Sequence, residues 1–231
     1  MKLGIMQPYF FPYLGYWQLI NAVDKYVVYD DVTYIKGGWI NRNNILLNNS
    51  SHLITLSLVN SSSFKNINEI EITRDSIKLE KLLKTIKVAY MKAPHYKEIM
   101  PIIEKLVKTN TNIAKLNFNS IIEINKYLNI QTEILLSSQI KKDNKLKAQD
   151  KVIHINEILG ADTYYNAIGG QTLYSKEIFK EKGINLRFLK MNELRYKQFN
   201  NEFVPNLSII DVLMFNKKET IQKYLDNFCL I

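Results

Sequence analysis

The chain has 231 residues, of which 46% are hydrophobic and 23% charged, as in a globular protein with a sizeable core. Its net charge of +9 favours anionic partners such as nucleotides or nucleotide sugars, but the lysines are dispersed, which argues against a nucleic-acid-binding module. The single cysteine, Cys229, excludes a disulfide framework or a multi-cysteine metal site within one chain, and it fits a reducing cytosol.

The first predicted elements open an α/β sheet. An apolar strand at 2–6 leads into an extended connection at 7–12, because residues before proline avoid helical backbone angles. Apolar residues spaced by three predict a helix at 13–23, and a second strand follows at 25–29. Turn-rich breaks separate three further segments with β character, at 39–46, 53–59 and 67–73.

The segment at 3–23 has no charged side chain, which is also a property of membrane spans. Pro8 and Pro12 interrupt it, however, and the amides of Gln7 and Gln18 would be costly in lipid. It also lacks the basic region and small-residue cleavage site of a signal peptide. We therefore expect a cytoplasmic protein without a transmembrane segment.

Three amphipathic helices are predicted next, and we interpret residues 76–129 as a helical insertion or subdomain. Asp75 and Ser76 are good N-cap residues for the first of these helices. The helices are expected at 77–91, 96–108 and 113–128. In the third helix, the residues that suit a buried face are Ile121, Ile122, Ile124 and Leu128.

Alternating strands and helices then continue to the end of the chain. The strands are predicted at 132–136, 163–168 and 184–190, and the helices at 147–159, 173–181, 208–214 and 219–225. The whole pattern predicts an α/β fold with a mainly parallel, open, Rossmann-like sheet flanked by helices. Because no internal repeat or long linker is evident, we expect residues 1–231 to form a single α/β domain.

Two adjacent carboxylates, Asp30 and Asp31, directly follow the second predicted strand. Ligands of open α/β sheets usually bind beyond the carboxyl ends of parallel strands. Burial or a like-charged neighbour would raise the pKa of one carboxyl toward that of a general base. A turn or helix-capping role is an equally good interpretation. His95, at a helix boundary, is a third candidate for the base.

The segment 36–43 combines two glycines with a lysine, a tryptophan and an arginine. Glycine permits close backbone approach, arginine binds phosphate or carboxylate in two-pronged fashion, and tryptophan stacks on a base or sugar. We therefore favour a substrate-binding role over a simple hairpin turn. The candidate binding residues here are Tyr34, Lys36, Trp39, Asn41 and Arg42.

The aromatic residues between positions 9 and 17 are too many for all to be core residues. Phe10, Phe11 and Trp17 are the better core candidates, whereas tyrosine hydroxyls need partners and suit the wall of a pocket. Gln7 follows the first strand and should lie at the same sheet edge as Asp30. The pocket-lining candidates are Gln7, Tyr9, Tyr13 and Tyr16.

Three residues between a late strand and helix, Gly169, Gly170 and Gln171, form a weaker candidate, because the N–H groups of helix starts bind anions. A tight turn is the alternative. No two histidines have the spacing of a zinc site, so we expect no metal and no cofactor. The sequence has no nucleophile elbow, P-loop or Gly-x-Gly-x-x-Gly motif.

Three segments together resemble the WbqC-like family of bacterial polysaccharide-cluster proteins. They are IMQPYFFPYLGYW at 5–17, DDVTYIK at 30–36 with NRN at 41–43, and NLSIIDVLMFN at 206–216. Their order and spread imply a resemblance over nearly the whole chain. Gly37 departs from the pattern, which has a bulkier and often basic residue at that position.

The resemblance implies a role in making O-antigen lipopolysaccharide or a similar surface glycan. The activity suggested for the family is aminoacyl transfer, with glycyl as one candidate, to an amino sugar. The opening of the chain also looks like that of nucleotidyltransferase-like α/β domains. Those domains have a phosphate-binding histidine where this chain has Tyr16, which argues against nucleotidyl transfer.

We therefore predict a transferase that acylates the amino group of a nucleotide-linked amino sugar, using an activated acyl donor. Asp30, Asp31 or His95 would supply the base, and Lys36 and Arg42 would hold the diphosphate. Because no acyl-accepting nucleophile is evident, direct attack on the donor is expected. The alternatives are an ATP-dependent ligase or nucleotidyltransferase of the same pathway, and a non-catalytic assembly protein for glycan biosynthesis.

Overall fold

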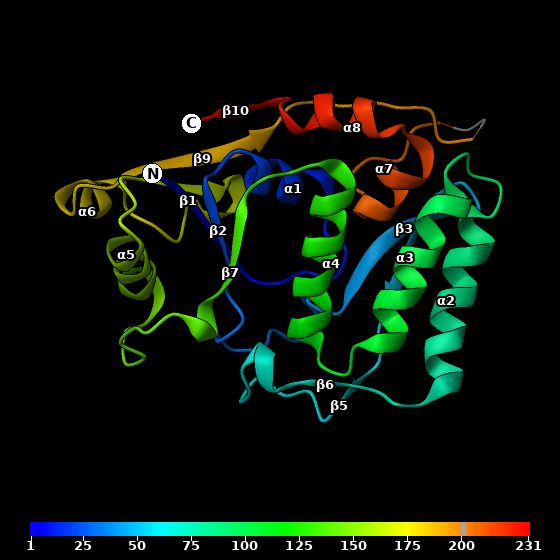
Figure 1. Cartoon of the computed structure of the whole chain (residues 1–231), viewed down its shortest axis with the longest axis horizontal. Helices are drawn as coiled ribbons and strands as arrows, with labels where there is room; N and C mark the ends of the chain where they lie inside the picture. Colours follow the sequence, from blue (N-terminus) through cyan, green and yellow to red (C-terminus); the bar gives the residue numbers. More distant parts are fainter. Residues whose placement is uncertain (200–201) are drawn as a thin grey trace.

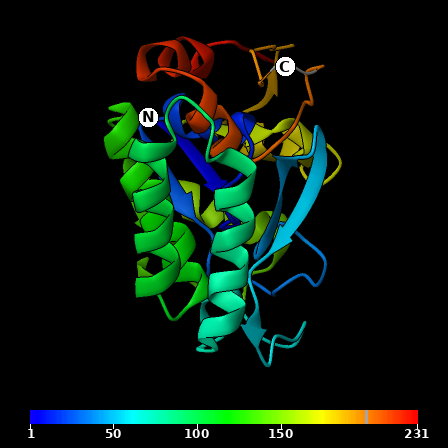
Figure 2. The ribbon, with the colours of Figure 1, turned by 90° about the vertical axis from the view of Figure 1, so that its right-hand side faces the viewer.

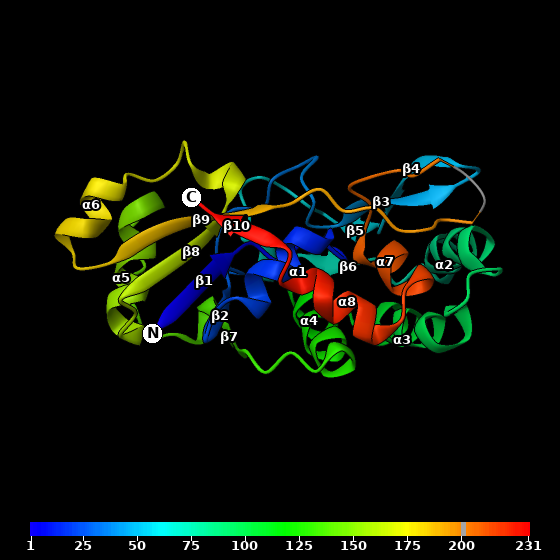
Figure 3. The same ribbon diagram turned by 90° about the horizontal axis from the view of Figure 1, so that it is seen from above.

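The computed structural model describes residues 1–199 and 202–231, and its centre is a six-stranded sheet (Figure 1). Every neighbouring pair of strands is parallel except β9 with β10. The strands lie side by side in the order β10 (Phe228–Leu230), β9 (Asn185–Met191), β8 (Thr163–Ala167), β1 (Lys2–Met6), β2 (Lys25–Val28) and β7 (Glu133–Leu136), as Figure 3 shows from above. The predicted mainly parallel, open α/β sheet is confirmed.

The order of these strands is that of a doubly wound fold. The chain starts in the middle with β1, moves outward through β2 to β7, and then crosses to β8 and β9 on the other side of β1. Helices connect the parallel strands: α1 (Leu14–Asn21), α5 (Ala148–Leu159) and α6 (Lys176–Glu181). The direction of winding therefore reverses between β1 and β8, and ligands of such sheets bind at that reversal point, beyond the strand carboxyl ends.

Alternating side chains of the strands pack into two cores, one on each face of the sheet. Leu3 and Ile5 of β1 pack with residues of α5 and α6 in one core. Tyr26 and Val28 of β2 belong to the other core, together with the aromatic residues of α1. Gly4 has no side chain to contribute, and an added Cβ there would lie 2.9 Å from the Tyr26 ring.

A second group of elements lies at the carboxyl side of the sheet, on the right in Figure 1. The hairpin of β3 (Arg42–Leu47) and β4 (Ser50–Thr55) packs beside α2 (Ser76–Tyr90), as Figure 2 shows. The short strands β5 (Leu58–Val59) and β6 (Glu71–Ile72) pair below them. The remaining helices are α3 (Tyr96–Thr109), α4 (Ile113–Leu128), α7 (Ile209–Phe215) and α8 (Lys218–Leu225).

The helices predicted from the sequence are confirmed, with boundaries that shift by a few residues. Asp75 caps α2, since its carboxylate accepts hydrogen bonds from the backbone N–H groups of Ile77 and Lys78. Two predictions are wrong in detail. Ile122 is 41% exposed rather than buried, because it lies on the outer face of α4. The segment at 67–73 contains a 3-10 turn at Ile67–Glu69 and only a two-residue strand.

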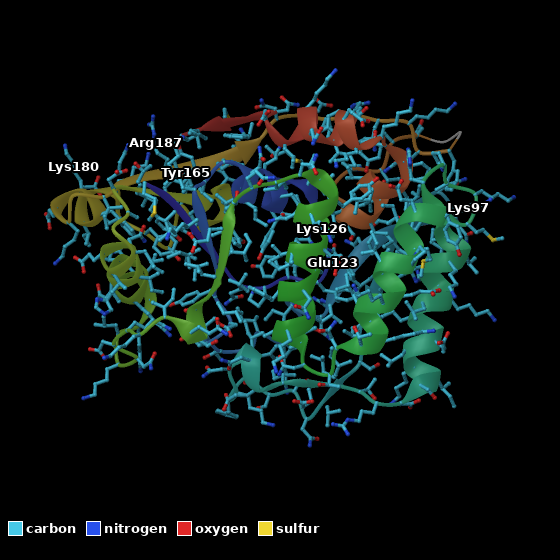
Figure 4. The ribbon with its side chains drawn as sticks, in the orientation of Figure 1. Lys97, Glu123, Lys126, Tyr165, Lys180 and Arg187 are labelled. Carbon is cyan, nitrogen blue, oxygen red and sulfur yellow. The ribbon has the colours of Figure 1, made fainter. Side chains whose placement is uncertain are left out.

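The surface carries cations over many elements rather than in one stripe. Figure 4 labels Lys97 on α3 and Lys126 on α4, which lie apart from Lys180 on α6 and Arg187 on β9. Lys180 and Arg187 line one surface pocket. None of the helices in the described part of the chain is long and apolar enough to cross a membrane.

Candidate functional site

A cleft of about 840 Å³ opens at the carboxyl ends of β1, β2 and β7. Gln7 borders it from β1, Tyr29 and Asp31 from β2, and Ser138 from β7. The opposite wall is formed by the loop before α5 and by the first turn of α5 itself. This is the edge at which open α/β sheets bind ligands. We call this cavity the carboxyl-edge cleft.

The floor of the carboxyl-edge cleft is a cluster of one carboxylate and two lysines. The Oδ2 atom of Asp31 lies 2.8 Å from the Nζ of Lys142 and 3.2 Å from the Nζ of Lys151. Lys142 also donates to the backbone oxygen of Ser137, and Lys151 to that of Asp31. The cluster therefore ties the loop after β7 and the start of α5 to the end of β2.

The two lysine side chains of this cluster are only 2% and 9% exposed, and the Asp31 side chain is 13% exposed. Burial tends to raise the pKa of the Asp31 carboxyl, but the hydrogen bond from Lys142 and the charges of both lysines outweigh it and hold the pKa below its usual value. Asp31 is thus a stable anion that clamps two cations. It is poorly suited to act as a general base near neutral pH.

The carboxyl-edge cleft carries an excess of positive charge. Its charged lining residues are Lys142, Lys147, Lys151 and Asp31, which give a net charge of +2. The amino end of α5 points into the same space, and helix N-termini add a partial positive charge. Ala148, at the first position of α5, has a left-handed φ of +46°, a strained conformation of a kind that gathers at binding sites. The cleft is therefore suited to an anionic ligand.

Tyr29 lies between this cluster and the strand end. The Lys151 ammonium lies 5.3 Å from the centre of its ring, within the range of a cation–π interaction. Burial, followed by the nearby charge of Asp31, raises the pKa of the Tyr29 hydroxyl well above its usual value. Tyr29 is consequently neutral at physiological pH and offers the cleft a hydroxyl and an aromatic edge.

Asp30 has a structural setting that differs from that of Asp31. It is 2% exposed, and both of its carboxylate oxygens accept hydrogen bonds from Ser138, at 2.9 Å from the backbone N–H and 2.6 Å from the hydroxyl. This pair joins the ends of β2 and β7. His95 stands at the start of α3, with its backbone N–H donating to Met214, and does not line the cleft. The structure therefore does not bring the three proposed bases together.

The tyrosines proposed as pocket residues separate into different environments. Tyr16 is 1% exposed, and its hydroxyl donates to the backbone oxygen of Gln7, so it lies in the core. Tyr9 is half-buried and stacks obliquely on Tyr16, with ring centres 5.6 Å apart. Tyr13 lines a separate, smaller cavity. Of the N-terminal candidates, only Gln7 borders the carboxyl-edge cleft itself.

Most of the segment 34–43 folds onto itself, and of its residues only Ile35 lines the carboxyl-edge cleft. Tyr34 is 4% exposed and donates to the Asn41 side chain, which in turn donates to the backbone of Leu56. Arg42 donates to the backbone oxygens of Gly37 and Gly38 and lies 5.9 Å from the Trp39 ring centre. Lys36 and Trp39 are exposed. None of the five binding candidates in this segment lines the carboxyl-edge cleft.

Gly169, Gly170 and Gln171 lie beyond the end of β8, where a 3-10 turn spans Ile168–Gly170. An added Cβ at Gly170 would lie 2.4 Å from the Oδ1 of Asn166, whereas one at Gly169 would meet nothing within 4 Å. Close packing against Asn166 therefore explains why position 170 is a glycine. These residues border the winding reversal beside β1 but do not line the cleft.

The three lysines that line the cleft, Lys142, Lys147 and Lys151, were not predicted from the sequence. Lys142 and Lys147 lie in the connection between β7 and α5, and Lys151 lies in the first turn of α5. The strand-end rule applied to β7 points to the connection that carries the first two of these lysines, but not to the individual residues. Within the described residues, no three histidine, cysteine or acidic side chains gather as a metal site would require.

The fold and the cleft define an open α/β protein with a cationic site at the carboxyl edge of its sheet. The model of the WbqC-like protein family matches residues 7–223, and the chain belongs to that family. The chain is also 28% identical over 230 residues to an uncharacterized protein of Mycobacterium tuberculosis, Rv1507c, with 97% of each chain covered. No solved structure matches the chain.

Proposed function

We propose that the protein binds a nucleotide-linked amino sugar in the carboxyl-edge cleft and transfers an acyl group to its amino nitrogen during surface-glycan synthesis. The observation that carries this proposal is the pairing of two buried lysines, Lys142 and Lys151, with one carboxylate. Burying a cation without a full counter-charge is costly. A diphosphate bound above the cluster would supply the missing negative charge.

The size and lining of the cleft support a ligand with several polar groups. A volume of about 840 Å³ lies in the range of small-molecule sites. Gln7, Thr33, Asn66 and Asn144 line it with amide and hydroxyl groups that can bond sugar hydroxyls. Lys147 is exposed at the start of α5, where it can reach a phosphate.

The positive field of the cleft also favours the proposed chemistry. An amine of this kind titrates near an α-amino group, at about 7.7–8.0, and nearby cations lower that pKa. The neutral nitrogen attacks the acyl carbon of the activated donor, the bond to the leaving atom breaks, and the leaving group takes that electron pair. The nitrogen gives up one proton, which passes to the departing group or to solvent water. No covalent enzyme intermediate is required.

The nucleotidyltransferase alternative is less well supported. In the resemblance to that fold, Tyr16 takes the place of a phosphate-binding histidine, but Tyr16 is buried with its hydroxyl committed to Gln7. That position therefore cannot contact a nucleotide. The alternative of a non-catalytic binding or assembly protein predicts that no acyl group is transferred, so the transfer reactions below separate it from the proposal.

Calorimetric titration with UDP-glucosamine tests the proposal, with UDP and free glucosamine as partial ligands. We expect the complete molecule to bind most tightly, and its affinity to fall as salt is raised, because the lysines provide the attraction. Single-turnover reactions with glycyl and acetyl thioesters, followed by mass spectrometry, then test transfer. A failure of every nucleotide sugar to bind would overturn the proposal.

Two lysine variants make a matched comparison. Lys147→Gln removes an exposed cation that lines the cleft. Lys36→Gln removes an exposed cation that does not line it, although the neighbouring Ile35 does. We expect Lys147→Gln to weaken UDP-glucosamine several-fold and Lys36→Gln to leave the affinity unchanged. If Lys36→Gln caused the larger loss, the ligand would be bound by the 36–43 segment instead.

A further inference from the structure

A second cavity, of about 290 Å³, lies apart from the carboxyl-edge cleft. The start of α1, the segment that follows β9 and the residues leading into α7 form its walls. The volume equals that of about ten water molecules, which is room for a molecule of roughly ten heavy atoms. Its lining is mainly apolar or aromatic and includes Tyr13, Leu14, Leu194, Tyr196, Phe203 and Leu207. We call it the small cavity.

The wall of the small cavity is held by a buried carboxylate. Asp211 is fully buried, and its Oδ2 accepts hydrogen bonds from the Tyr196 hydroxyl at 2.6 Å and the Gln198 amide at 2.7 Å. Tyr13 forms a backbone bridge to Ser208, immediately before α7. These contacts shape the cavity before any ligand arrives, which lowers the entropy cost of binding.

The small cavity is lined by one acid and one base in addition to its apolar wall. Glu193 and Arg195 both border it, and they bond to each other at 3.0 Å. Their side chains are 78% and 75% exposed. An ion pair this exposed contributes little to stability. Breaking it so that each side chain can bind a ligand therefore costs little free energy.

We propose that the small cavity binds a free apolar α-amino acid, such as leucine, as its zwitterion. The carboxylate of the ligand bonds the planar guanidinium of Arg195, and its ammonium bonds Glu193. The hydrophobic side chain fills the apolar interior. The site is separate from the carboxyl-edge cleft, and the inference does not rest on the function proposed for that cleft.

Calorimetric or NMR titration with three matched compounds tests this inference. L-Leucine carries both charges, 4-methylpentanoate lacks the ammonium and 3-methylbutylamine lacks the carboxylate. We expect L-leucine to bind in the millimolar range or tighter, and each analogue about two- to fivefold more weakly, because each loses one ion pair to a solvent-exposed side chain. Equal affinities of the three compounds, or no binding of L-leucine, would overturn the inference.

Variants of Arg195 and Glu193 test which charged group of the ligand each side chain binds. Arg195→Gln should weaken L-leucine but leave 3-methylbutylamine unchanged, and Glu193→Gln should weaken L-leucine but leave 4-methylpentanoate unchanged. Lys197→Gln, an exposed neighbour that does not line the cavity, should change none of them. Because all three residues are exposed, thermal unfolding should confirm that each variant folds. UDP-glucosamine binding is measured in parallel, so that failure at one site is distinguished from failure at the other.

Discussion

Tyr90 and Asp211, which are 121 residues apart in the chain, share a hydrogen bond of 2.9 Å in the core. Both residues are fully buried. The Tyr90 hydroxyl donates to the Oδ1 of Asp211 and accepts from the backbone N–H of Leu46, so one group joins α2, α7 and β3. This network positions the walls of the small cavity, because Asp211 also holds Tyr196.

Removing the Tyr90 hydroxyl should destabilise the protein. In Tyr90→Phe, the carboxylate of Asp211 loses one donor and the Leu46 N–H loses its side-chain acceptor. A buried polar group left without a partner costs about 1–3 kcal/mol. We expect the free energy of unfolding, measured with urea, to fall by about that amount. Tyr224→Phe is the control, since its hydroxyl contacts Asn216 only at 3.4 Å, and it should cost less than about 1 kcal/mol.

The Asp211 carboxyl should make stability fall as pH rises. Burial raises its pKa above the ordinary value of 3.8, against the lowering effect of the hydrogen bonds from Tyr196, Gln198 and Tyr90. Above pH 3.8 the unfolded chain releases the proton while the folded protein keeps it, until the raised pKa is passed. The contribution of Asp211 to the free energy of unfolding is therefore greatest below pH 3.8, and it declines between pH 3.8 and the raised pKa of the folded protein.

Urea unfolding of the wild type and of Asp211→Asn from pH 3.5 upward measures this effect. We expect the difference in unfolding free energy between wild type and variant to shrink with rising pH, because the variant has no proton to lose. A difference that grew with pH instead would mean that the folded protein prefers the ionised carboxylate.

Much of the fold follows from local sequence signals. The strand at 2–6 is confirmed at its exact bounds, and the helix predicted at 113–128 is α4 exactly. Apolar periodicity and an N-cap such as Asp75 identify such elements because they depend on near neighbours. β10 was not predicted, since a three-residue edge strand after a helix is stabilised only by its pairing with β9.

The site is harder to predict because its contacts span long stretches of chain. The strand-end rule predicts Gln7, Asp30 and Asp31 at one sheet edge, and of these Gln7 and Asp31 line the cleft. It does not reveal that Asp31 is neutralised by Lys142 and Lys151, which lie more than 100 residues away. In the same way, Tyr16 and Tyr34 carry polar hydroxyls, but backbone and side-chain partners found only in the folded structure make them core residues.

The cluster of Asp31, Lys142 and Lys151 gives a test in which removing the carboxylate alone should destabilise the protein more than removing the carboxylate together with one lysine. Asp31→Asn leaves Lys142 and Lys151 as buried cations without a counter-ion, and breaking a buried pair costs about 3–5 kcal/mol. The double variant Asp31→Asn with Lys142→Met should recover part of that loss, because it removes one of the unpaired charges. Chemical unfolding of the single and double variants at pH 7 measures both effects.

The same carboxyl predicts a pH dependence opposite to that of Asp211. The folded-state pKa of Asp31 is depressed below 3.8, as burial is outweighed by the hydrogen bond and charge of Lys142. Its stabilising contribution is therefore present above pH 3.8 and is lost as pH falls through the depressed value. Acid unfolding should begin at higher pH in Asp31→Asn than in the wild type. An unchanged acid transition would show that the ion cluster contributes no net stability.

Two adjacent glycines at the end of β8 should respond very differently to alanine. In Gly170→Ala the new methyl group would lie 2.4 Å from the Oδ1 of Asn166, a side chain that is 4% exposed and donates to the Tyr164 hydroxyl at 2.5 Å. Asn166 or the turn must shift, and overpacking of this kind costs about 1–3 kcal/mol.

Gly169→Ala is the matched control, since its methyl group meets nothing within 4 Å and its φ is not in the left-handed region. We expect it to change the free energy of unfolding by less than about 0.5 kcal/mol. Thermal or urea unfolding of the two variants decides the matter. Equal effects would mean that the turn, not the contact with Asn166, requires glycine. Because neither residue lines the carboxyl-edge cleft, both variants should bind UDP-glucosamine as the wild type does.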